Sequence, residues 1–459
     1  MSKGLIISAP SSGSGKTIVT LGIMRALKNR GVDIRPAKTG PDYIDSSYLA
    51  KAAGRKTLNL DSFAMGKNQL LGLASTYEGA GNKSDELLIV EGVMGLFDGA
   101  AVSRVTNVDH FPVGQGSSAD LAIKMGLPVI IVVNCSSMAQ SIGAIIYGFA
   151  NFSKDINITG VILNLVGSKK HEMMLRDALL PLGIEVLGAI YRDDGLNIKS
   201  RHLGLILPNE IDDAEGLIIK AAKIVEKSLN LDRLIELSSS IKKAKPTSYL
   251  APLGQHIAIA KDKAFAFIYE HFLLGWKEAG AQVSFFSPLA NQAPDETADA
   301  VFLLGGYPEL FGQELANADI FMAGLIKAKE RDALIYGECG GFMVLGEALV
   351  DAKGVAHKMS GLLPITSTIN KPKRVLGYRY LSHKSPLPWA ENLVGHEFHY
   401  SSCSSNNLSP LFEATDAKGD KLPAMGAVNK NVMGSYAHVI SAQQIKSAQL
   451  AYGEEKNEC

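Results

Sequence analysis

The sequence predicts an α/β protein with two doubly wound domains, each built on a parallel sheet. Short apolar runs of strand length alternate with helical patterns through the first half of the chain. A polar stretch rich in serine, lysine and proline interrupts this alternation near residue 240, and the alternation then begins again. A chain of 459 residues is also too long for one ordinary hydrophobic core. Such alternation is typical of parallel sheets covered by helices.

The first half contains apolar runs that are flanked by glycine or polar residues, with helical patterns between them. We expect strands at 5–9, 87–91, 128–134 and 160–165, and helices at 17–29, 117–125 and 139–150. These elements predict a first domain over residues 1–240.

The second half follows a stretch of structure-breaking residues. Residues 238–246 read Ser-Ser-Ser-Ile-Lys-Lys-Ala-Lys-Pro, and Pro252 and Gly254 come soon after. This composition predicts a linker at 241–253 and a second domain at 254–447, the alternative being a surface loop inside one domain. We expect strands at 256–260, 282–286, 300–304 and 333–336, and helices at 264–279 and 312–329.

Composition and charge narrow the classes of partner. Hydrophobic residues make up 46% of the chain and charged residues 20%, and 46 basic residues balance 46 acidic ones. A net charge of zero gives no broad basic field for nucleic acid. The chain also shows no apolar run of membrane-spanning length and no signal or transit peptide pattern at its start. The sequence therefore predicts a cytoplasmic protein that binds neither nucleic acid nor a membrane.

The four cysteines are scattered, with no Cys-x-x-Cys pair: they are Cys135, Cys339, Cys403 and Cys459. A disulfide framework or a zinc site is therefore not expected, and each cysteine is judged alone. Cys135 follows an apolar run and is expected to be a small buried residue, whereas Cys459 lies in a polar tail.

A phosphate-binding loop is expected between the strand at 5–9 and the helix at 17–29. The loop contains Gly13, Ser14, Gly15, Lys16 and Thr17. Glycines let backbone N–H groups turn toward phosphate oxygens, and the helix N-terminus adds positive potential. In such a loop the lysine reaches the outer phosphates of a nucleotide and the threonine hydroxyl binds Mg²⁺. The loop departs from the usual pattern at Pro10, where a glycine is common.

Four acidic residues are candidates to complete the Mg²⁺ and substrate site. Asp42 and Asp45 lie three residues apart, Glu91 ends an apolar strand, and Asp98 follows it. Parallel sheets place ligand-binding groups at the carboxyl ends of their strands, and Mg²⁺ prefers oxygen ligands. The alternative for each acid is a helix cap or a turn carboxylate.

Cys339 is a candidate nucleophile because glycines surround it in Gly337-Glu338-Cys339-Gly340-Gly341, between a predicted strand and a helix at 341–349. Such a tight turn exposes a nucleophile, and a helix N-terminus favours the thiolate. The alternative is a small core residue. The loop at 305–309, with Gly306 and Tyr307, follows a predicted strand and could direct N–H groups at a tetrahedral intermediate.

A thiol nucleophile needs a base, which is normally histidine. The candidates are His396, His399 and His438, and the residues alone do not choose among them. His396 and His399 could also form a metal pair, but packing along a strand is the commoner explanation for their spacing.

Several motifs together resemble one enzyme family. They are Pro41-Asp42-Tyr43-Ile44-Asp45, Glu91-Gly92-Val93-Met94-Gly95, Gly305-Gly306-Tyr307-Pro308-Glu309, Glu338-Cys339-Gly340-Gly341 and Gly395-His396-Glu397-Phe398-His399-Tyr400-Ser401. In this order they resemble the a,c-diamide synthases of cobalamin biosynthesis, which act on cobyrinate or hydrogenobyrinate. The resemblance runs from about residue 4 to about residue 440.

The resemblance implies an N-terminal P-loop domain similar to dethiobiotin synthetase and a C-terminal class I glutamine amidotransferase domain with a flavodoxin-like sheet. It implies that Cys339 is the glutaminase nucleophile and His438 its base. It also implies that residues 13–17 bind ATP and that Asn164 contacts the adenine. Thr17, Asp42 and Glu91 are then the Mg²⁺ residues, and the substrate residues are Asp45, Asp98, Gly306 and Tyr307.

One departure from ordinary class I amidotransferases concerns the base. Those enzymes carry a glutamate two residues after the histidine, where this chain has Ile440. The resembled family commonly lacks that glutamate, so a Cys–His dyad is expected, and the sequence does not show what orients His438.

The implied reaction converts carboxylates to amides. ATP would phosphorylate a carboxylate to an acyl phosphate, and ammonia released from glutamine by Cys339 would displace the phosphate. The expected partners are small molecules: a corrinoid polycarboxylate, L-glutamine and ATP. The sequence leaves open whether the acceptor carries cobalt, the order of the two amidations and the oligomeric state, for which a homodimer is one candidate.

Other amidotransferases with a P-loop are alternatives, namely a nickel-sirohydrochlorin a,c-diamide synthase, a cobyric acid synthase or a CTP synthase. The Pro-Asp-Tyr-Ile-Asp and Gly-His-Glu-Phe-His-Tyr motifs favour a tetrapyrrole a,c-diamide synthase over the last two. A non-enzymatic switch of the partitioning-ATPase type is disfavoured because Ser11 stands where such proteins carry a signature lysine.

Overall fold

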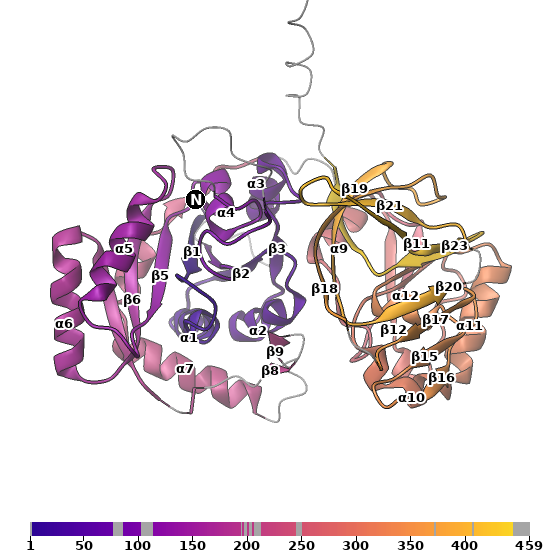
Figure 1. Cartoon of the computed structure of the whole chain (residues 1–459), viewed down its shortest axis with the longest axis horizontal. Coiled ribbons are helices and arrows are strands. Elements are labelled where there is room, and N and C mark those ends of the chain that lie inside the picture. Colours follow the sequence, from indigo (N-terminus) through magenta and orange to yellow (C-terminus); the bar gives the residue numbers. More distant parts are fainter. Residues whose placement is uncertain are drawn as a thin grey trace, which may run out of the picture.

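The computed structural model describes residues 2–76, 86–101, 113–193, 195–196, 200–201, 204–205, 213–244, 250–370, 373–405 and 408–443. They form two lobes that lie side by side (Figure 1). Cys459, residues 245–249 of the predicted linker and the predicted end of the second domain at residue 447 lie outside the described residues. The domain boundaries therefore stay predictions.

The N-terminal lobe is built on a sheet with the strand order β3-β2-β4-β1-β5-β6-β7, all parallel. Its strands are β1 (Lys3–Ser8), β2 (Ile34–Thr39), β3 (Leu58–Leu60), β4 (Leu87–Glu91), β5 (Val129–Asn134), β6 (Ile158–Val166) and β7 (Glu185–Tyr191). A short strand, β10 (Ser239–Ser240), pairs antiparallel with β1. The four predicted strands are confirmed. The sequence does not predict β2, because an arginine, a proline and a lysine interrupt its apolar run.

Helices cover both faces of this sheet (Figure 1). They are α1 (Lys16–Asn29), α2 (Tyr43–Ala53), α3 (Lys67–Thr76), α4 (Ser118–Met125), α5 (Ser141–Asn151), α6 (Lys169–Leu179), α7 (Ala214–Ser228) and α8 (Leu231–Glu236). The three predicted helices are confirmed as α1, α4 and α5. Leu5, Ile6 and Ile7 of β1 are all fully buried, as a strand covered on both faces requires. Cys135 is buried, as predicted.

The C-terminal lobe contains a sheet with the order β12-β11-β13-β14-β24-β23, in which only β23 is antiparallel. Its strands are β11 (His256–Ala260), β12 (Gln282–Phe286), β13 (Ala300–Leu303), β14 (Leu334–Glu338), β23 (Ala427–Asn429) and β24 (Val432–Ser435). The four strands predicted for this half are confirmed as β11 to β14. With the N-terminal sheet, this confirms the predicted α/β fold class.

Two further sheets complete the C-terminal lobe and are not predicted by the sequence. One has the order β22-β21-β18-β19-β25 and is antiparallel; the other has the order β16-β15-β17-β20. Their strands are β15 (Ala348–Val350), β16 (Ala356–Lys358), β17 (Ile365–Thr368), β18 (Val375–Ser382), β19 (Asn392–His399), β20 (Ser402–Ser405), β21 (Phe412–Asp416), β22 (Lys421–Met425) and β25 (His438–Ala442).

The helices of this lobe differ from prediction at three places. The helix expected at 264–279 begins only at Glu270, as α9 (Glu270–Glu278), because Ala266 and Phe267 donate their N–H groups to the Gly305 carbonyl. The helix expected at 312–329 is broken into α10 (Gly312–Ala316) and α11 (Asp319–Glu330). The helix expected at 341–349 is the short α12 (Gly340–Val344), followed by strand β15. Within the described ranges, no helix combines the length and apolar character needed to span a membrane.

Aromatic residues join the two lobes. Tyr43 of α2 stacks on Phe267 and Tyr269, with ring centroids 5.0 Å and 4.6 Å apart. Phe63, which follows β3, stacks on Tyr378 of β18 at 4.0 Å. Such contacts bury large apolar area at small cost in side-chain entropy. The carboxyl ends of strands in the first lobe are therefore held against the second lobe.

The packing of α1 against α7 yields a prediction about glycine. A Cβ atom added to Gly22 of α1 would lie 2.7 Å from Val225 Cγ2 and 2.8 Å from the Ala221 carbonyl oxygen. Gly22→Ala is therefore expected to destabilise the fold by about 1–3 kcal/mol through overpacking. Thermal unfolding midpoints measure this loss.

The matched control is Gly148→Ala in α5, where an added Cβ meets nothing within 4 Å. There the better helix propensity of alanine should stabilise by about 0.5–1 kcal/mol. The close packing of α1 on α7 is contradicted if both variants shift the midpoint in the same direction.

Candidate active sites

The loop between β1 and α1 has the backbone of a phosphate cradle. Gly13 and Gly15 have φ angles of 79° and 82°, in the left-handed region that favours glycine. A Cβ atom on Gly15 would lie 2.2 Å from Asn164 Nδ2. The loop is braced further by Ser14, whose hydroxyl donates to the Ser11 carbonyl at 2.9 Å. These contacts hold the loop in the shape of a phosphate cradle.

Asn164, near the end of β6, lies against this loop. Its Nδ2 donates to the Ser14 carbonyl at 2.9 Å. It also lines a cavity formed by the loop and the carboxyl ends of β6 and β7, together with Gly13, Gly15, Ile18, Leu165, Ile190, Tyr191, Arg192, Asp193 and Leu196. Ligands of open α/β sheets bind at this edge. A contact of Asn164 with adenine stays a prediction.

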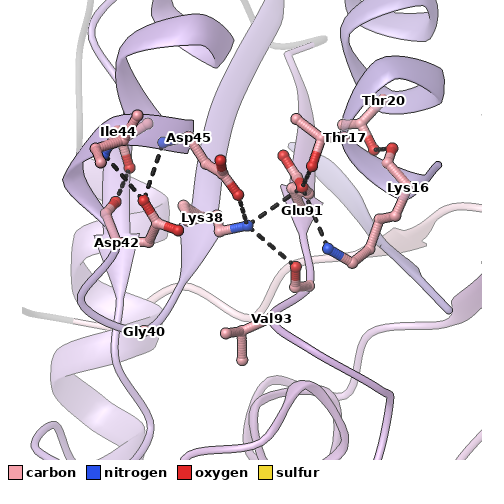
Figure 2. Close-up of polar contacts among 12 residues, drawn as sticks. Lys16, Thr17, Thr20, Lys38, Gly40, Asp42, Ile44, Asp45, Glu91 and Val93 are labelled. Atoms are coloured by element: carbon pink, nitrogen blue, oxygen red, sulfur yellow. Dashed lines mark hydrogen bonds and ion pairs between the residues drawn. The ribbon is translucent and has the colours of Figure 1, made fainter. Parts of the chain in front are cut away.

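Glu91, at the end of β4, is the centre of a buried ionic cluster (Figure 2). Its Oε1 accepts from the Thr17 hydroxyl at 2.6 Å and lies 3.3 Å from Lys16 Nζ and 3.2 Å from Lys38 Nζ. Lys38 also pairs with Asp45 at 2.6 Å. The structure thus brings three polar side chains to the Glu91 carboxylate, and Asp45 joins the cluster through Lys38.

Two lysines of this cluster have opposite pKa shifts. Burial, together with the positive charge of Lys38, lowers the pKa of Lys16. Burial also acts to lower the pKa of Lys38. Three nearby carboxylates have the larger, opposite effect and raise this pKa: Asp45, Glu91 and Asp42. Lys38 is therefore a fixed cation. Sequence reasoning missed it, although a lysine at the end of a buried strand just before the Pro-Asp-Tyr-Ile-Asp motif is a usable signal.

Asp42 and Asp98 act as caps in the structure. One oxygen of Asp42 accepts the N–H groups of Ile44 and Asp45, each at 2.9 Å, at the N-terminus of α2. Asp98 Oδ2 accepts the Gly95 N–H at 2.9 Å. One carboxylate oxygen of each residue thus serves as a helix cap or turn acceptor, which was the alternative prediction for these acids. Burial and the charge of Asp42 raise the pKa of Asp45.

The donor set around Glu91 fits a hard divalent cation. Glu91 Oε2 is buried and has no hydrogen-bond partner among the described residues. No three described side chains of His, Cys, Asp or Glu gather closely enough to hold a metal by themselves. Mg²⁺ bound together with a nucleotide needs only one or two side chains, because phosphates and water supply its other ligands.

Cys339 lies on a strained turn between β14 and α12. Its φ of 49° is unusual for a residue with a side chain. The turn is held by the Cys339 N–H, which donates to the Ser435 carbonyl at 2.8 Å. A Cβ atom on Gly341 would lie 2.1 Å from the Leu303 carbonyl oxygen, so the turn packs directly on β13. This is the geometry of a nucleophile elbow.

The thiol itself departs from expectation. Burial, followed by the negative charge of Glu309, raises the pKa of Cys339, while the Gly340 N–H works in the opposite direction. The N–H at the start of α12 thus favours the thiolate, as expected, but burial and the nearby carboxylates outweigh it. The nucleophile needs a base to remove its proton.

His438 lies beside the elbow. Its Nδ1 is 3.6 Å from Glu338 Oε2, and Glu338 is the residue immediately before Cys339. The other oxygen of Glu338 accepts from the Val439 N–H at 3.1 Å and from the Tyr336 hydroxyl at 3.0 Å. A Cβ atom on Gly305 would lie 2.3 Å from His438 Cε1, so only glycine fits under the imidazole. A carboxylate thus lies on the Nδ1 side of His438, although position 440 is an isoleucine.

The other two histidines have different surroundings. His396 stacks on His438 with centroids 4.9 Å apart, and its Nε2 lies 2.9 Å from the Tyr269 hydroxyl. Burial, together with the charge of His438, lowers the pKa of His396 well below its usual range, so its ring is neutral. His399 bonds instead to Glu397 at 3.2 Å and to the Ser401 carbonyl.

The loop at 305–309 lies against the elbow. A Cβ atom on Gly340 would lie 3.1 Å from the Gly306 nitrogen, which places that nitrogen next to the turn. The N–H of Tyr307 donates to the Ala264 carbonyl at 3.0 Å. The N–H of Tyr307 is thus engaged inside the lobe, and an oxyanion contact of the Gly306 N–H stays a prediction.

The charge of Glu309 yields a prediction for Cys339. Glu309→Gln removes a negative charge that raises the thiol pKa. The pKa should fall and the thiolate fraction at a fixed pH near 8 should rise, so iodoacetamide should modify Cys339 about threefold faster. Mass spectrometry of the Cys339 peptide measures the rate, with Cys339→Ala as the blank.

Glu413→Gln is the matched control, because Glu413 is an exposed acid on β21 of the same lobe. It should leave the rate unchanged. An unchanged or slower rate in Glu309→Gln would show that Glu309 does not set the thiol pKa.

Both halves of the chain match models of known domain families. Residues 5–206 match the CobQ/CobB/MinD/ParA nucleotide binding domain, and residues 256–445 match the CobB/CobQ-like glutamine amidotransferase domain. The two matches coincide with the two lobes that carry the phosphate loop and the cysteine elbow.

Relatives are similar over nearly the whole chain. The hydrogenobyrinate a,c-diamide synthase of Brucella anthropi is 48% identical over 442 residues, which cover 95% of this chain and 98% of that protein. Proteins of the same name from Rhizobium meliloti and Rhodobacter capsulatus are 45% and 43% identical, over 95% and 96% of this chain and 99% of each relative. The chain therefore belongs to the family of the hydrogenobyrinate a,c-diamide synthases.

Proposed function

We propose that this enzyme converts the a- and c-side-chain carboxylates of hydrogenobyrinate to amides, using ATP and glutamine. Its family and its two domain matches make it a glutamine-dependent, amide-forming ligase with a nucleotide-binding domain. Hydrogenobyrinate is proposed as the acceptor because the chain is 43–48% identical, over nearly their full length, to relatives named for that compound. The acceptor, glutamine and ATP are its small-molecule partners.

The synthetase step takes place at the edge of the N-terminal sheet. A carboxylate is a poor electrophile, so an acceptor oxygen first attacks the γ-phosphorus of ATP and ADP leaves. Lys16 offsets charge on the transferring phosphoryl group. Thr17 and Glu91 are the residues that would hold Mg²⁺, and Asp42 would contribute its second oxygen. Bound Mg²⁺ supplies positive charge beside the outer phosphates.

In this proposal the acceptor molecule binds beside three side chains of the N-terminal lobe, Lys38, Asp45 and Asp98. Lys38 is a cation whose Nζ lies between two carboxylates, so it can hold the acceptor carboxylate near the phosphate. Ammonia then attacks the acyl phosphate, the amide forms and phosphate leaves.

The glutaminase step takes place at the elbow. His438 removes the thiol proton, and Cys339 attacks the amide carbon of glutamine while the Gly306 N–H faces the oxyanion. Glu338 orients His438 through Nδ1. The tetrahedral intermediate collapses to a thioester, and His438 returns the proton to the leaving ammonia. Water then hydrolyses the thioester to glutamate.

Ammonia has to reach the acyl phosphate unprotonated, since ammonium is not a nucleophile. We infer that it passes through a sheltered route between the lobes, where Tyr43 and His438 lie within hydrogen-bond distance. A cytoplasmic location and a homodimer belong to the same proposal. Sedimentation of the purified chain tests the dimer.

Separating the two steps tests the assignment of Cys339. Cys339→Ala should lower glutamine-dependent amidation at least about a thousandfold, because the nucleophile is lost. The same variant should still amidate with added ammonium at high pH, because the synthetase site is intact. Cys403→Ala, at a half-buried cysteine on β20, is the control and should keep both activities. Loss of both activities in Cys339→Ala would contradict two separate sites.

The acceptor is tested by counting amides. Purified enzyme is incubated with ATP, glutamine and one of hydrogenobyrinate, cobyrinate or nickel-sirohydrochlorin, and mass spectrometry counts each replacement of a hydroxyl by an amino group. We expect two replacements on hydrogenobyrinate. Faster amidation of cobyrinate or of nickel-sirohydrochlorin would overturn the proposed acceptor.

A further inference from the structure

Tyr43 belongs to the synthetase lobe by sequence and to the glutaminase site by position. It is the first residue of α2, between Asp42 and Asp45. Its ring stacks on Phe267 at 5.0 Å and an interplanar angle of 13°, and on Tyr269 at 4.6 Å and 28°. Both partners belong to the other lobe, so the ring is held in one orientation.

The hydroxyl of Tyr43 contacts the glutaminase base. It lies 3.3 Å from His438 Nδ1, the same nitrogen that Glu338 approaches at 3.6 Å. A phenol hydroxyl can donate or accept, so Tyr43 can form a hydrogen bond with this nitrogen in either tautomer of His438.

A second tyrosine fixes this hydroxyl. Tyr269 shares a side-chain hydrogen bond with Tyr43, and its hydroxyl lies 2.9 Å from His396 Nε2. The His396 ring stacks on His438 at an interplanar angle of 10°. Two tyrosines and two histidines thus form a closed ring of contacts. In this ring Tyr43 comes from the opposite lobe.

We propose, building on the glutaminase role of Cys339 and His438, that Tyr43 is a positioning residue for glutamine cleavage that the synthetase lobe supplies to the glutaminase. A general base that serves a nucleophile through one ring nitrogen is oriented by a third group at the other nitrogen. Glu338 alone is 3.6 Å away, beyond an ordinary hydrogen bond. The Tyr43 hydroxyl shares the task and holds the imidazole at the elbow.

The test is Tyr43→Phe, assayed as glutamine hydrolysis by the full-length enzyme without corrinoid. The variant keeps the stacked ring and loses only the hydroxyl. We expect the kcat for hydrolysis to fall about tenfold, as for a lost hydrogen bond to a group that becomes charged. We expect KM for glutamine and the thermal midpoint to stay unchanged, since a positioning role acts on the reacting state.

Tyr378→Phe is the matched control. Tyr378 is another tyrosine at the lobe contact: it stacks on Phe63, and its hydroxyl donates to Asp61 at 3.1 Å without contacting His438. It should keep the wild-type kcat.

Three results would overturn the proposal: a kcat within twofold of wild type in Tyr43→Phe, an equal loss in Tyr378→Phe, or a loss explained by a raised KM or a lowered midpoint. The assay contains no acceptor, so its outcome is independent of whether hydrogenobyrinate is the substrate.

Discussion

The buried carboxylate of Glu91 is the constraint on which the rest of the structure depends. A carboxylate without solvent has to be paired, and breaking a buried pair costs about 3–5 kcal/mol. Thr17 and Lys16 meet it from the phosphate loop, and Lys38 meets it from β2. Lys38 extends the cluster to Asp45 on α2. One charge therefore fixes the positions of the nucleotide loop, two strand ends and the first turn of α2.

The position of that turn determines how the lobes meet. Both sheets present the carboxyl ends of their strands to the contact: α2 follows β2, Phe63 follows β3, and in the other lobe Gly305 and Cys339 follow β13 and β14. Parallel sheets bind ligands at these ends. The lobes lie side by side (Figure 1), and the Tyr43–His438 contact joins their two functional edges. Ammonia released at the glutaminase site would thus start its route next to the synthetase lobe.

Local signals made parts of this arrangement predictable from sequence. The glycine-rich loop at 13–17 and the elbow at Cys339 each lie within one strand–turn–helix unit, so neighbouring residues specify them. Lys38 and Glu338 escaped prediction as site residues, because their roles depend on pairing with charges distant in sequence. The raised pKa of Cys339 was missed for the same reason, since burial is a property of the assembled fold. The sequence also does not predict the strands beyond residue 347; the longest of them, β18 and β19, pair antiparallel and lie outside the strand–helix alternation.

The position of Tyr43 makes the glutaminase lobe depend on the synthetase lobe. A glutaminase that carried all of its own parts could be fused to a new synthetase and work at once. Here the imidazole of His438 contacts the hydroxyl of Tyr43, which belongs to the synthetase lobe. Tyr43 lies in the first turn of α2, between Asp42 and Asp45 of the synthetase lobe. Fusing the second lobe to an unrelated synthetase domain would therefore remove a hydrogen-bond partner of His438.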